Sequence, residues 1–218
     1  MALLDAYATI AQYRAALGDK ATGADTAITA ELLVMSRQLE RKLWLSPGYF
    51  NASTASQARI FDGSGRDTLR LRDTDGMAYC LTTLDADGLA IDSDLDGSYD
   101  DYTLDFNDAW VRGLPENAAA HSEPFTAIQL RPLSAATLTT FPRLVGSVKI
   151  TGTWGWTAVP QIITDLVIHR THELRQGLVA GATQDYPAYD GAIPLQPKTL
   201  WLFREAERLW GRPLLAVR

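Results

Sequence analysis

Thr151-Gly-Thr-Trp-Gly-Trp-Thr-Ala-Val-Pro160 is the stretch in which the residue pattern changes from that of a strand to that of a helix. Val148-Lys-Ile-Thr151 alternates apolar and polar residues, which is typical of a β-strand. The glycines that follow allow a tight turn, and the closing proline can start a helix without losing a hydrogen bond. The two tryptophans bring large apolar surfaces to this turn. The stretch therefore predicts a junction that fixes how a sheet and a group of helices meet.

Beyond this junction the chain has a helical pattern. A helix is predicted to start at Val159-Pro160 and to end at Gly181, and residues 182–196 are expected to be an extended connection because they contain prolines. A last helix is predicted from about Pro197 to Trp210. The first helix places one set of side chains on one side: Ile163, Leu166, Val167, Arg170, Leu174 and Leu178. The last helix does the same with Leu200, Phe203, Ala206, Leu209 and Trp210.

Two helices are also predicted before residue 50. The first covers Asp5–Leu17 and ends at Gly18, which suits a left-handed cap. The second is capped by Asp25 or Thr26 and should end at Ser46-Pro-Gly48, since proline cannot continue the hydrogen-bond ladder. Its apolar residues recur every three or four positions: Ile28, Leu32, Met35, Leu39 and Leu43.

From about Gln57 the pattern has a period of two and turn residues are frequent. Five strands are predicted, at Thr68–Leu71, Ala78–Leu84, Thr103–Phe106, Phe125–Leu130 and Val145–Thr151. Glycine-containing turns are predicted at residues 62–65, 74–76, 85–88 and 94–97, because glycine supplies the positive φ that hairpin turns need. These features indicate a small antiparallel sheet.

The predicted fold class is α+β, mainly an α-helical bundle formed by the N- and C-terminal helices, with an inserted antiparallel β segment. The predicted parts are residues 1–56, which hold the N-terminal helices, residues 57–152, which form the inserted β domain, and residues 153–218, which hold the C-terminal helices and an extended tail. No internal repeat is visible.

Charge and composition exclude several classes of protein. The net charge is −6, and residues 51–150 carry fifteen acids against eight bases, which leaves −7. Such a segment argues against a protein that grips nucleic-acid phosphates, although not against one that DNA slides past. No run of eighteen apolar residues is present to span a membrane, and the first residues lack the pattern of a signal peptide, so we expect synthesis in the cytosol. Cys80 is the single cysteine, which excludes an internal disulfide.

The most enzyme-like feature is Asp92-Ser-Asp-Leu-Asp96-Gly-Ser-Tyr-Asp100, which is similar to the first half of an EF-hand calcium loop. Carboxylates at alternate positions and a glycine at the sixth suit a hard cation. However, the twelfth position is Thr103 and not a bidentate glutamate, and the flanking segments have strand patterns. We interpret the stretch as an acidic, solvated hairpin turn, with a weak Ca²⁺ site as the alternative.

Other candidates for chemistry lack a required partner. His169, His172 and Glu173 lie on one predicted helix, but no third histidine or cysteine is spaced to complete a zinc site; a polar helix face or a subunit contact explains them better. Gly63-Ser-Gly-Arg66 lacks the ending of a phosphate loop. His121 lies among Ala, Asn and Ser in a predicted loop and suggests no pair of base and nucleophile. We therefore predict no catalytic residues, no metal ligands, no cofactor and no enzymatic activity.

The junction at residues 151–160 resembles the strand, GxWGW and Val-Pro-helix arrangement of tailed-bacteriophage head–tail connector (adaptor, or head-completion) proteins. Further similar features follow the family's order over roughly residues 25–180: an N-terminal helix pair ending near Trp44, the Asp94–Tyr99 turn, Pro115-Glu-Asn-Ala118, and Glu123-Pro-Phe125 leading into a strand. This chain has a larger β segment and an added C-terminal extension.

The resemblance implies a structural subunit of a phage neck. Members form a ring, here expected to be a dodecamer, that joins the portal protein to a downstream neck or tail protein. DNA passes through the lumen without sequence-specific binding, and no membrane is involved. The expected location is the neck of the virion, after assembly in the host cytoplasm. The alternative is a β-rich binding module of a virion or host protein, possibly Ca²⁺-dependent.

Two contact hypotheses follow. The net-basic C-terminal extension would dock on the portal through Trp201, Phe203, Trp210, Arg212 and Pro213–Arg218. Part of the acidic β segment would line the channel and repel DNA phosphates through Asp92, Asp94, Asp96, Asp100 and Asp101. Those aspartates could instead form a solvated outer rim of the ring.

Overall fold

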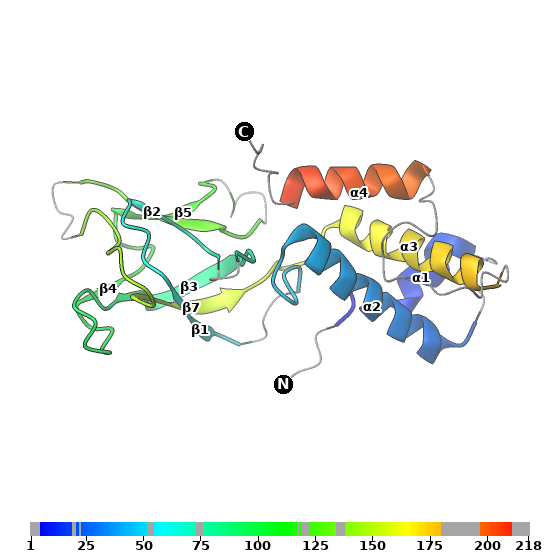
Figure 1. The fold of residues 1–218 in the computed structure, drawn as a ribbon, viewed down its shortest axis with the longest axis horizontal. Helices are drawn as coiled ribbons and strands as arrows, with labels where there is room; N and C mark the ends of the chain where they lie inside the picture. The colour runs from blue at the N-terminus through cyan, green and yellow to red at the C-terminus, as the bar shows by residue number, and fades with distance from the viewer. Residues whose placement is uncertain are drawn as a thin grey trace. The chain divides into compact units, whose positions relative to one another are not determined.

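The computed structural model describes residues 5–18, 21, 23–51, 55–72, 76–116, 118, 123–133, 138–179 and 197–210, with the backbone alone for 177–179. The chain divides into two compact units (Figure 1). Met1–Pro47 and Val159–Arg218 form a helical unit, and Gly48–Ala158 form a β unit. The boundaries predicted from sequence were at residues 57 and 153. The observed ones place both tryptophans of the 151–160 junction in the β unit.

The predicted fold class is wrong in making the protein mainly a helical bundle. The described residues form four helices and seven strands, and the strands make two antiparallel sheets, so the fold is mixed α+β. The error has a physical origin in the β unit. Two of its strands carry no clear alternation, and one predicted turn lies inside its longest strand, so the sheets are larger than the pattern suggested.

The first sheet has the order β1-β7-β3-β4, and every neighbouring pair is antiparallel. Its strands are β1 (Gln57–Phe61), β7 (Val148–Trp154), β3 (Leu81–Ile91) and β4 (Tyr102–Leu104). The second sheet has the order β2-β6-β5, again antiparallel. Its strands are β2 (Thr68–Arg70), β6 (Ala127–Leu130) and β5 (Val111–Leu114). The prediction missed β1 and β5.

Strand β7 lies inside the first sheet and includes the first four residues of the 151–160 junction. Its residues alternate strictly between buried and half-buried, and Val148, Ile150, Gly152 and Trp154 are the buried ones. A Cβ added at Gly152 would lie 2.1 Å from the carbonyl oxygen of Thr83, so only glycine lets β3 pass this closely. The Trp154 indole N–H donates to the carbonyl of Gln57 on β1, at 2.8 Å. The predicted strand therefore continues three residues past Thr151.

The turn predicted at residues 85–88 is wrong, because these residues form an irregularity within β3. The strand runs unbroken from Leu81 to Ile91, but its register against β7 shifts between Leu84 and Leu89. Asp87 has a φ of 54°, which is typical of a bulge. Asp-Ala-Asp-Gly is thus compatible with either a turn or a bulge, and pairing with β7 decides the outcome.

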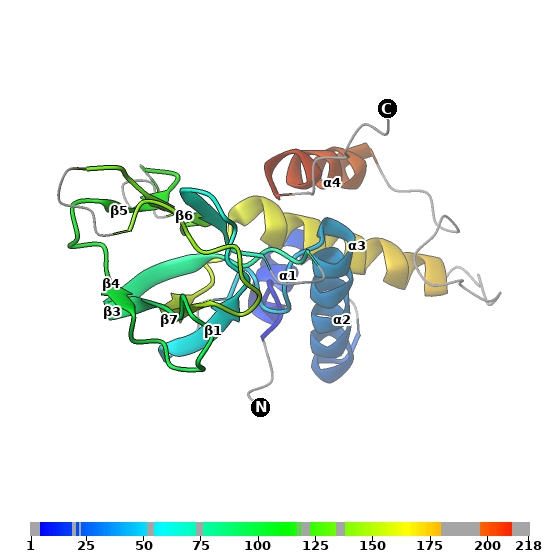
Figure 2. The ribbon, with the colours of Figure 1, turned by 60° about the vertical axis from the view of Figure 1, so that its left-hand side comes forward.

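The two sheets share one apolar core, and they lie one over the other in both views (Figures 1 and 2). Its buried members come from both sheets and from the loops between them: Phe61, Leu69, Leu71, Leu81, Leu89, Ile91, Leu104, Trp110, Val111, Ile128, Leu130, Phe141, Val148, Ile150 and Trp154. Burial on this scale stabilises the β unit through the hydrophobic effect.

In the helical unit, α1 (Ile10–Leu17) begins later than predicted, with a capping box between Thr9 and Gln12. The preceding chain is instead held by its backbone, since the Tyr7 amide donates to Ser36 Oγ at 2.9 Å. The predicted apolar residues of α2 (Asp25–Leu43) are confirmed as its buried side. This helix ends at Trp44 in the left-handed conformation, with φ 58°, which is before the predicted stop at Ser46-Pro-Gly48.

Helix α3 (Gln161–Val179) follows the Val-Pro pair, and α4 (Pro197–Trp210) has the predicted bounds. The two helices lie side by side in both views (Figures 1 and 2). The predicted apolar side of α4 is partly wrong: Thr199, Leu202, Phe203 and Ala206 are buried, whereas Leu209 is 47% exposed. Gly181, the 182–196 connection and the Leu178 side chain lie outside the described residues. Among the described helices none has the length and apolar character to cross a membrane.

Candidate functional site

The acidic loop Asp92–Asp101 connects β3 to β4, which pair antiparallel, so the predicted hairpin is confirmed. Asp92 is not solvated as predicted but only 3% exposed. Its carboxylate accepts hydrogen bonds from the backbone amides of Leu95, at 2.6 Å, and Gly97, at 3.1 Å. Its own amide donates to Ser147 at 2.9 Å. Asp92 therefore shapes the loop from inside.

Three carboxylates of this loop converge. Ligand oxygens of Asp92, Asp94 and Asp101 lie within 4.8 Å of one another, and this is the one such group of possible metal ligands in the described part of the chain. Asp101 accepts from the amide and hydroxyl of Ser93, both at 2.7 Å, and these bonds hold the pKa of its carboxyl below the ordinary value. Thr103, at the twelfth position of the calcium-loop pattern, lies in β4 opposite Ala90. The flanks are thus strands, unlike an EF-hand.

Of the His169, His172 and Glu173 group, Glu173 makes structural contacts within the helical unit. Glu173 is 6% exposed, accepts from Arg170 at 3.0 Å, and accepts from the Thr199 hydroxyl, which joins α3 to α4. Burial lowers the pKa of His169, with a further lowering by Lys198. The carboxylate that could have served a metal is thus committed to holding α4 on α3.

The remaining candidates are also explained by packing. A Cβ at Gly63 would meet the carbonyl of Pro142 at 1.9 Å, so the glycine-rich stretch at 63–66 permits a close approach between loops. Cys80 is buried, and burial raises the pKa of its thiol to about 12. His121, Arg212 and Pro213–Arg218 lie outside the described residues.

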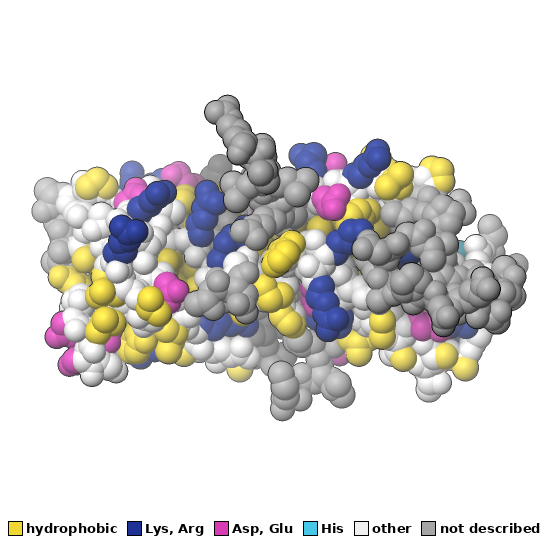
Figure 3. Space-filling view, in the orientation of Figure 1, with side chains coloured by type: hydrophobic (Ala, Val, Ile, Leu, Met, Phe, Trp, Pro, Cys, Tyr) yellow, Lys and Arg dark blue, Asp and Glu magenta, His cyan; other side chains and the backbone are white. Residues whose placement is uncertain are grey.

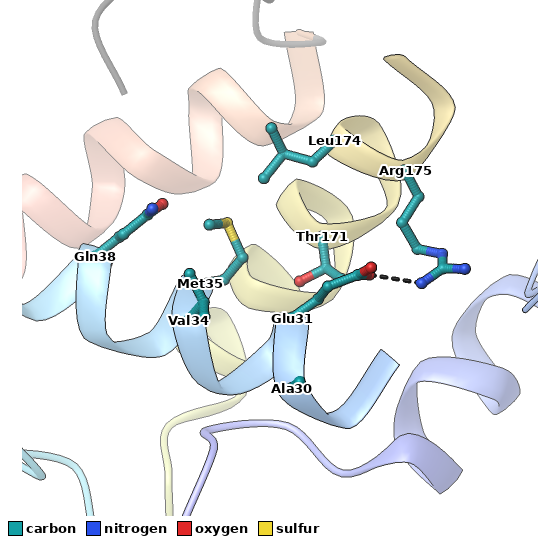
Figure 4. Close-up of a pocket in the computed structure, with 8 residues that line it drawn as sticks. All are labelled: Ala30, Glu31, Val34, Met35, Gln38, Thr171, Leu174 and Arg175. Carbon is teal, nitrogen blue, oxygen red and sulfur yellow. Dashed lines mark hydrogen bonds and ion pairs between the residues drawn. The ribbon is translucent and has the colours of Figure 1, made fainter. Parts of the chain in front are cut away.

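An apolar groove between α2 and α3 was not predicted (Figure 4). Its volume is about 340 Å³. Helix α2 contributes Ala30, Glu31, Val34, Met35 and Gln38, and α3 contributes Thr171, Leu174 and Arg175. An ion pair between Arg175 and Glu31, at 2.6 Å, spans one end of the groove. Val34, which lines the groove, is 51% exposed.

Two polar atoms of this groove are buried without a hydrogen-bond partner: Gln38 Oε1 and Thr171 Oγ1. Thr171 as a whole is 1% exposed. A buried polar atom with no partner costs roughly 1–3 kcal/mol, so proteins retain few of them without reason. The groove is therefore an apolar surface with a few unpaired polar atoms, a composition that is typical of binding sites.

The outer side of α4 is the second unusual surface of the helical unit. Trp201 is 61% exposed, more than any other tryptophan in the described residues. Basic and apolar side chains lie next to one another along this helix (Figure 3). Phe203, which we expected at a docking surface, is instead 7% exposed and lies under the ammonium of Lys42, 4.4 Å from the ring centre.

Neither surface follows from sequence periodicity. The α2 pattern identified the buried side, but not the flank on which Val34 and Gln38 lie. One residue could have indicated the α4 surface from the sequence: Trp201 is a large apolar residue that falls outside the predicted apolar side of its helix.

Comparisons with known proteins give one informative result. No protein-family model matches the chain, and no curated protein matches it in sequence. Among solved structures, it resembles a chain from the neck of an empty gene transfer agent (GTA) particle, whose structure was computed with C6 symmetry. The TM-score is 0.54 at 17% identity, and the match covers 100% of this chain and 97% of the other. The two chains therefore share a fold along their whole length.

Proposed function

We propose that this chain is a structural subunit of the neck of a tailed-phage-like particle. The observation that carries the proposal is the full-length likeness of its two-unit fold to a chain of such a neck. The resemblance of the 151–160 junction to head–tail connector proteins supports the same assignment independently. The location would be the virion neck, after assembly in the host cytoplasm.

In this proposal the chain acts by binding and has no catalytic activity. The residues that most resemble catalytic or metal-binding groups support this proposal, because each is explained by a structural role or by burial. Asp92 shapes its loop, Glu173 joins two helices, and Cys80 is buried.

The partners would be further copies of the chain, the portal protein, and the next neck or tail protein. A twelve-membered ring, as in connector proteins, contains six-fold symmetry and is thus compatible with the C6 symmetry of the similar neck. Each copy of such a ring presents two different surfaces, one to each neighbour. The helical unit has two candidates, the α2–α3 groove and the outer side of α4.

Portal docking is assigned to the C-terminal tail, residues 211–218. Phe203 no longer belongs to this hypothesis, since it is buried against Lys42. Deleting residues 211–218 should abolish portal binding and leave the thermal unfolding of the protein unchanged. Undiminished binding of the truncated protein to the portal would refute this assignment.

The acidic loop is assigned to the wall of the channel. Asp94, Asp96, Asp100 and Asp101 are exposed, and acidic side chains gather at this end of the β unit (Figure 3). Negative walls repel DNA phosphates and keep the genome mobile. Replacing these four residues by asparagine should change genome retention or ejection, whereas wild-type behaviour would contradict the assignment.

A calcium-dependent binding module is the second candidate, favoured by the convergence of Asp92, Asp94 and Asp101. Thermal unfolding with millimolar Ca²⁺ and with a chelator separates the two functions. Stabilisation by Ca²⁺ that Asp94→Asn removes would favour the calcium-dependent module. The test of the neck function is electron microscopy of the protein alone and mixed with its portal, in which we expect rings or a portal-bound collar.

A further inference from the structure

We infer that the α2–α3 groove receives Trp201 from a neighbouring copy of this chain, and that this insertion is the contact that builds the ring. The inference rests on the proposed function, because it requires the chain to assemble with itself. It assigns a specific donor and a specific acceptor surface to that assembly.

The chemistry of the groove defines its occupant. Most of the lining is apolar, so the occupant must have an apolar body. Gln38 Oε1 can only accept a hydrogen bond, and it is buried with no donor. The Thr171 hydroxyl, on the α3 side of the groove, is also unpaired. An occupant that satisfies the groove therefore combines an apolar body with an N–H or O–H donor.

An indole side chain meets this description. It is a large apolar body with a single N–H donor and no acceptor. Tryptophan buries roughly 150–250 Å² at an interface, and a groove of about 340 Å³ has room for one such side chain. An aliphatic side chain would fill the space but leave Gln38 Oε1 unpaired.

Trp201 is the tryptophan best placed to contact a neighbouring copy of the chain. It is 61% exposed, and it stands on α4, which contacts α3 and buries Leu202, Phe203 and Ala206 on its inner side. At 100° per residue, Trp201 points away from that buried side. It therefore faces away from α3 of its own copy, so the groove it enters belongs to another.

Charge at the two surfaces is complementary. Arg204 is exposed and three residues beyond Trp201, so it lies next to the indole on the same helix. The side chain of Glu31 at the end of the groove is 37% exposed, although it is already paired with Arg175. An insertion of Trp201 would bring a guanidinium toward this carboxylate. The surfaces differ and are carried by one chain, which is the condition for a closed ring.

Cross-linking tests the contact. A chain with Lys198→Cys, beside Trp201, and Ala30→Cys, at the groove, is treated with a short bis-maleimide after ring assembly. We expect a ladder of covalent oligomers. Either single variant should give no ladder, because the native Cys80 thiol is buried and its pKa is about 12. Adding Trp201→Ala to the double variant should remove the ladder.

Substitutions give an independent measure. Trp201→Ala should weaken association about thirty-fold or more, the usual effect of losing a tryptophan hot spot, while its circular dichroism and thermal unfolding stay those of the native chain. Trp201→Phe should be intermediate, since phenylalanine keeps the body and loses the donor. Ala30→Phe fills the groove and should also prevent assembly. Thr26→Phe, a similar enlargement at an exposed α2 position outside the groove, is the matched control and should assemble normally.

The outcomes separate this inference from the proposed function. Rings that require Trp201 and an open groove support both. Rings that form undiminished with Trp201→Ala, or that give no Trp201-dependent ladder, overturn the inference and leave the neck function standing. A native chain that forms no ring or collar, alone or with its portal, overturns both.

Discussion

Thr171→Val isolates the central physical feature of the groove, its unpaired buried hydroxyl. Thr171 Oγ1 is buried without a partner, and valine has nearly the same shape without the polar atom. Removing an unsatisfied buried polar group should raise the free energy of unfolding by about 1–3 kcal/mol. For a chain of this size that corresponds to a rise in Tm of roughly 2–4 °C per kcal/mol.

Thr164→Val is the matched control on the same helix, with the opposite expected sign. Thr164 is also buried, at 3% exposed, but its hydroxyl donates to the carbonyl of Tyr7 at 3.1 Å. Losing this bond leaves the carbonyl unpaired and should lower the free energy of unfolding by about 1–2 kcal/mol.

The assay is urea unfolding of the unassembled protein, followed by far-UV circular dichroism, which is dominated by the helical unit. If Thr171→Val instead destabilises the protein as Thr164→Val does, the Thr171 hydroxyl has a partner in the folded chain and is not an unpaired group of the groove.

Three further predictions concern other parts of the fold. Gly152→Ala should destabilise the β unit by about 1–3 kcal/mol, because the new Cβ would lie 2.1 Å from the Thr83 carbonyl; an unchanged midpoint of thermal unfolding would contradict this packing. Cys80 should react with a thiol probe at pH 8 only after denaturation, since its thiol is buried with a pKa of about 12; rapid labelling of the native chain would show that the thiol is accessible. Burial lowers the pKa of His169 below the ordinary histidine value of 6.5, so the folded state favours the neutral ring. The free energy of unfolding should therefore decline as the pH falls below 6.5, because the unfolded chain binds the proton first. His169→Gln should reduce the difference in free energy of unfolding between pH 7 and pH 5.5, measured by urea titration. An unchanged difference would exclude His169 as its source.

Elements that carry a clear local signal in the sequence were predicted correctly. The stripe from Ile28 to Leu43 predicted the buried side of α2, and prolines and glycines marked the start and end of α4. Strand β5 was missed because Val-Arg-Gly-Leu is too short to show alternation and contains a glycine. Strand β1 was missed because it is an edge strand, largely exposed on both faces.

The remaining features depend on contacts between segments that are distant in sequence, so local patterns could not predict them. Whether Asp85–Gly88 turns or bulges depends on pairing with β7, which is distant in sequence. The spacing of Asp92, Asp94 and Asp96 suggested a cation loop, yet the carboxylate of Asp92 is turned inward to backbone amides. Gln38 and Thr171 are ordinary residues in sequence. Their unpaired atoms become visible only when α2 and α3 are packed together.

Electron microscopy of the purified chain mixed with its portal is the decisive test of the neck assignment. We expect closed rings of the chain, stacked on the portal as a collar, and we expect Trp201→Ala to remove them. A chain that stays monomeric and leaves the portal bare would contradict the assignment to the neck.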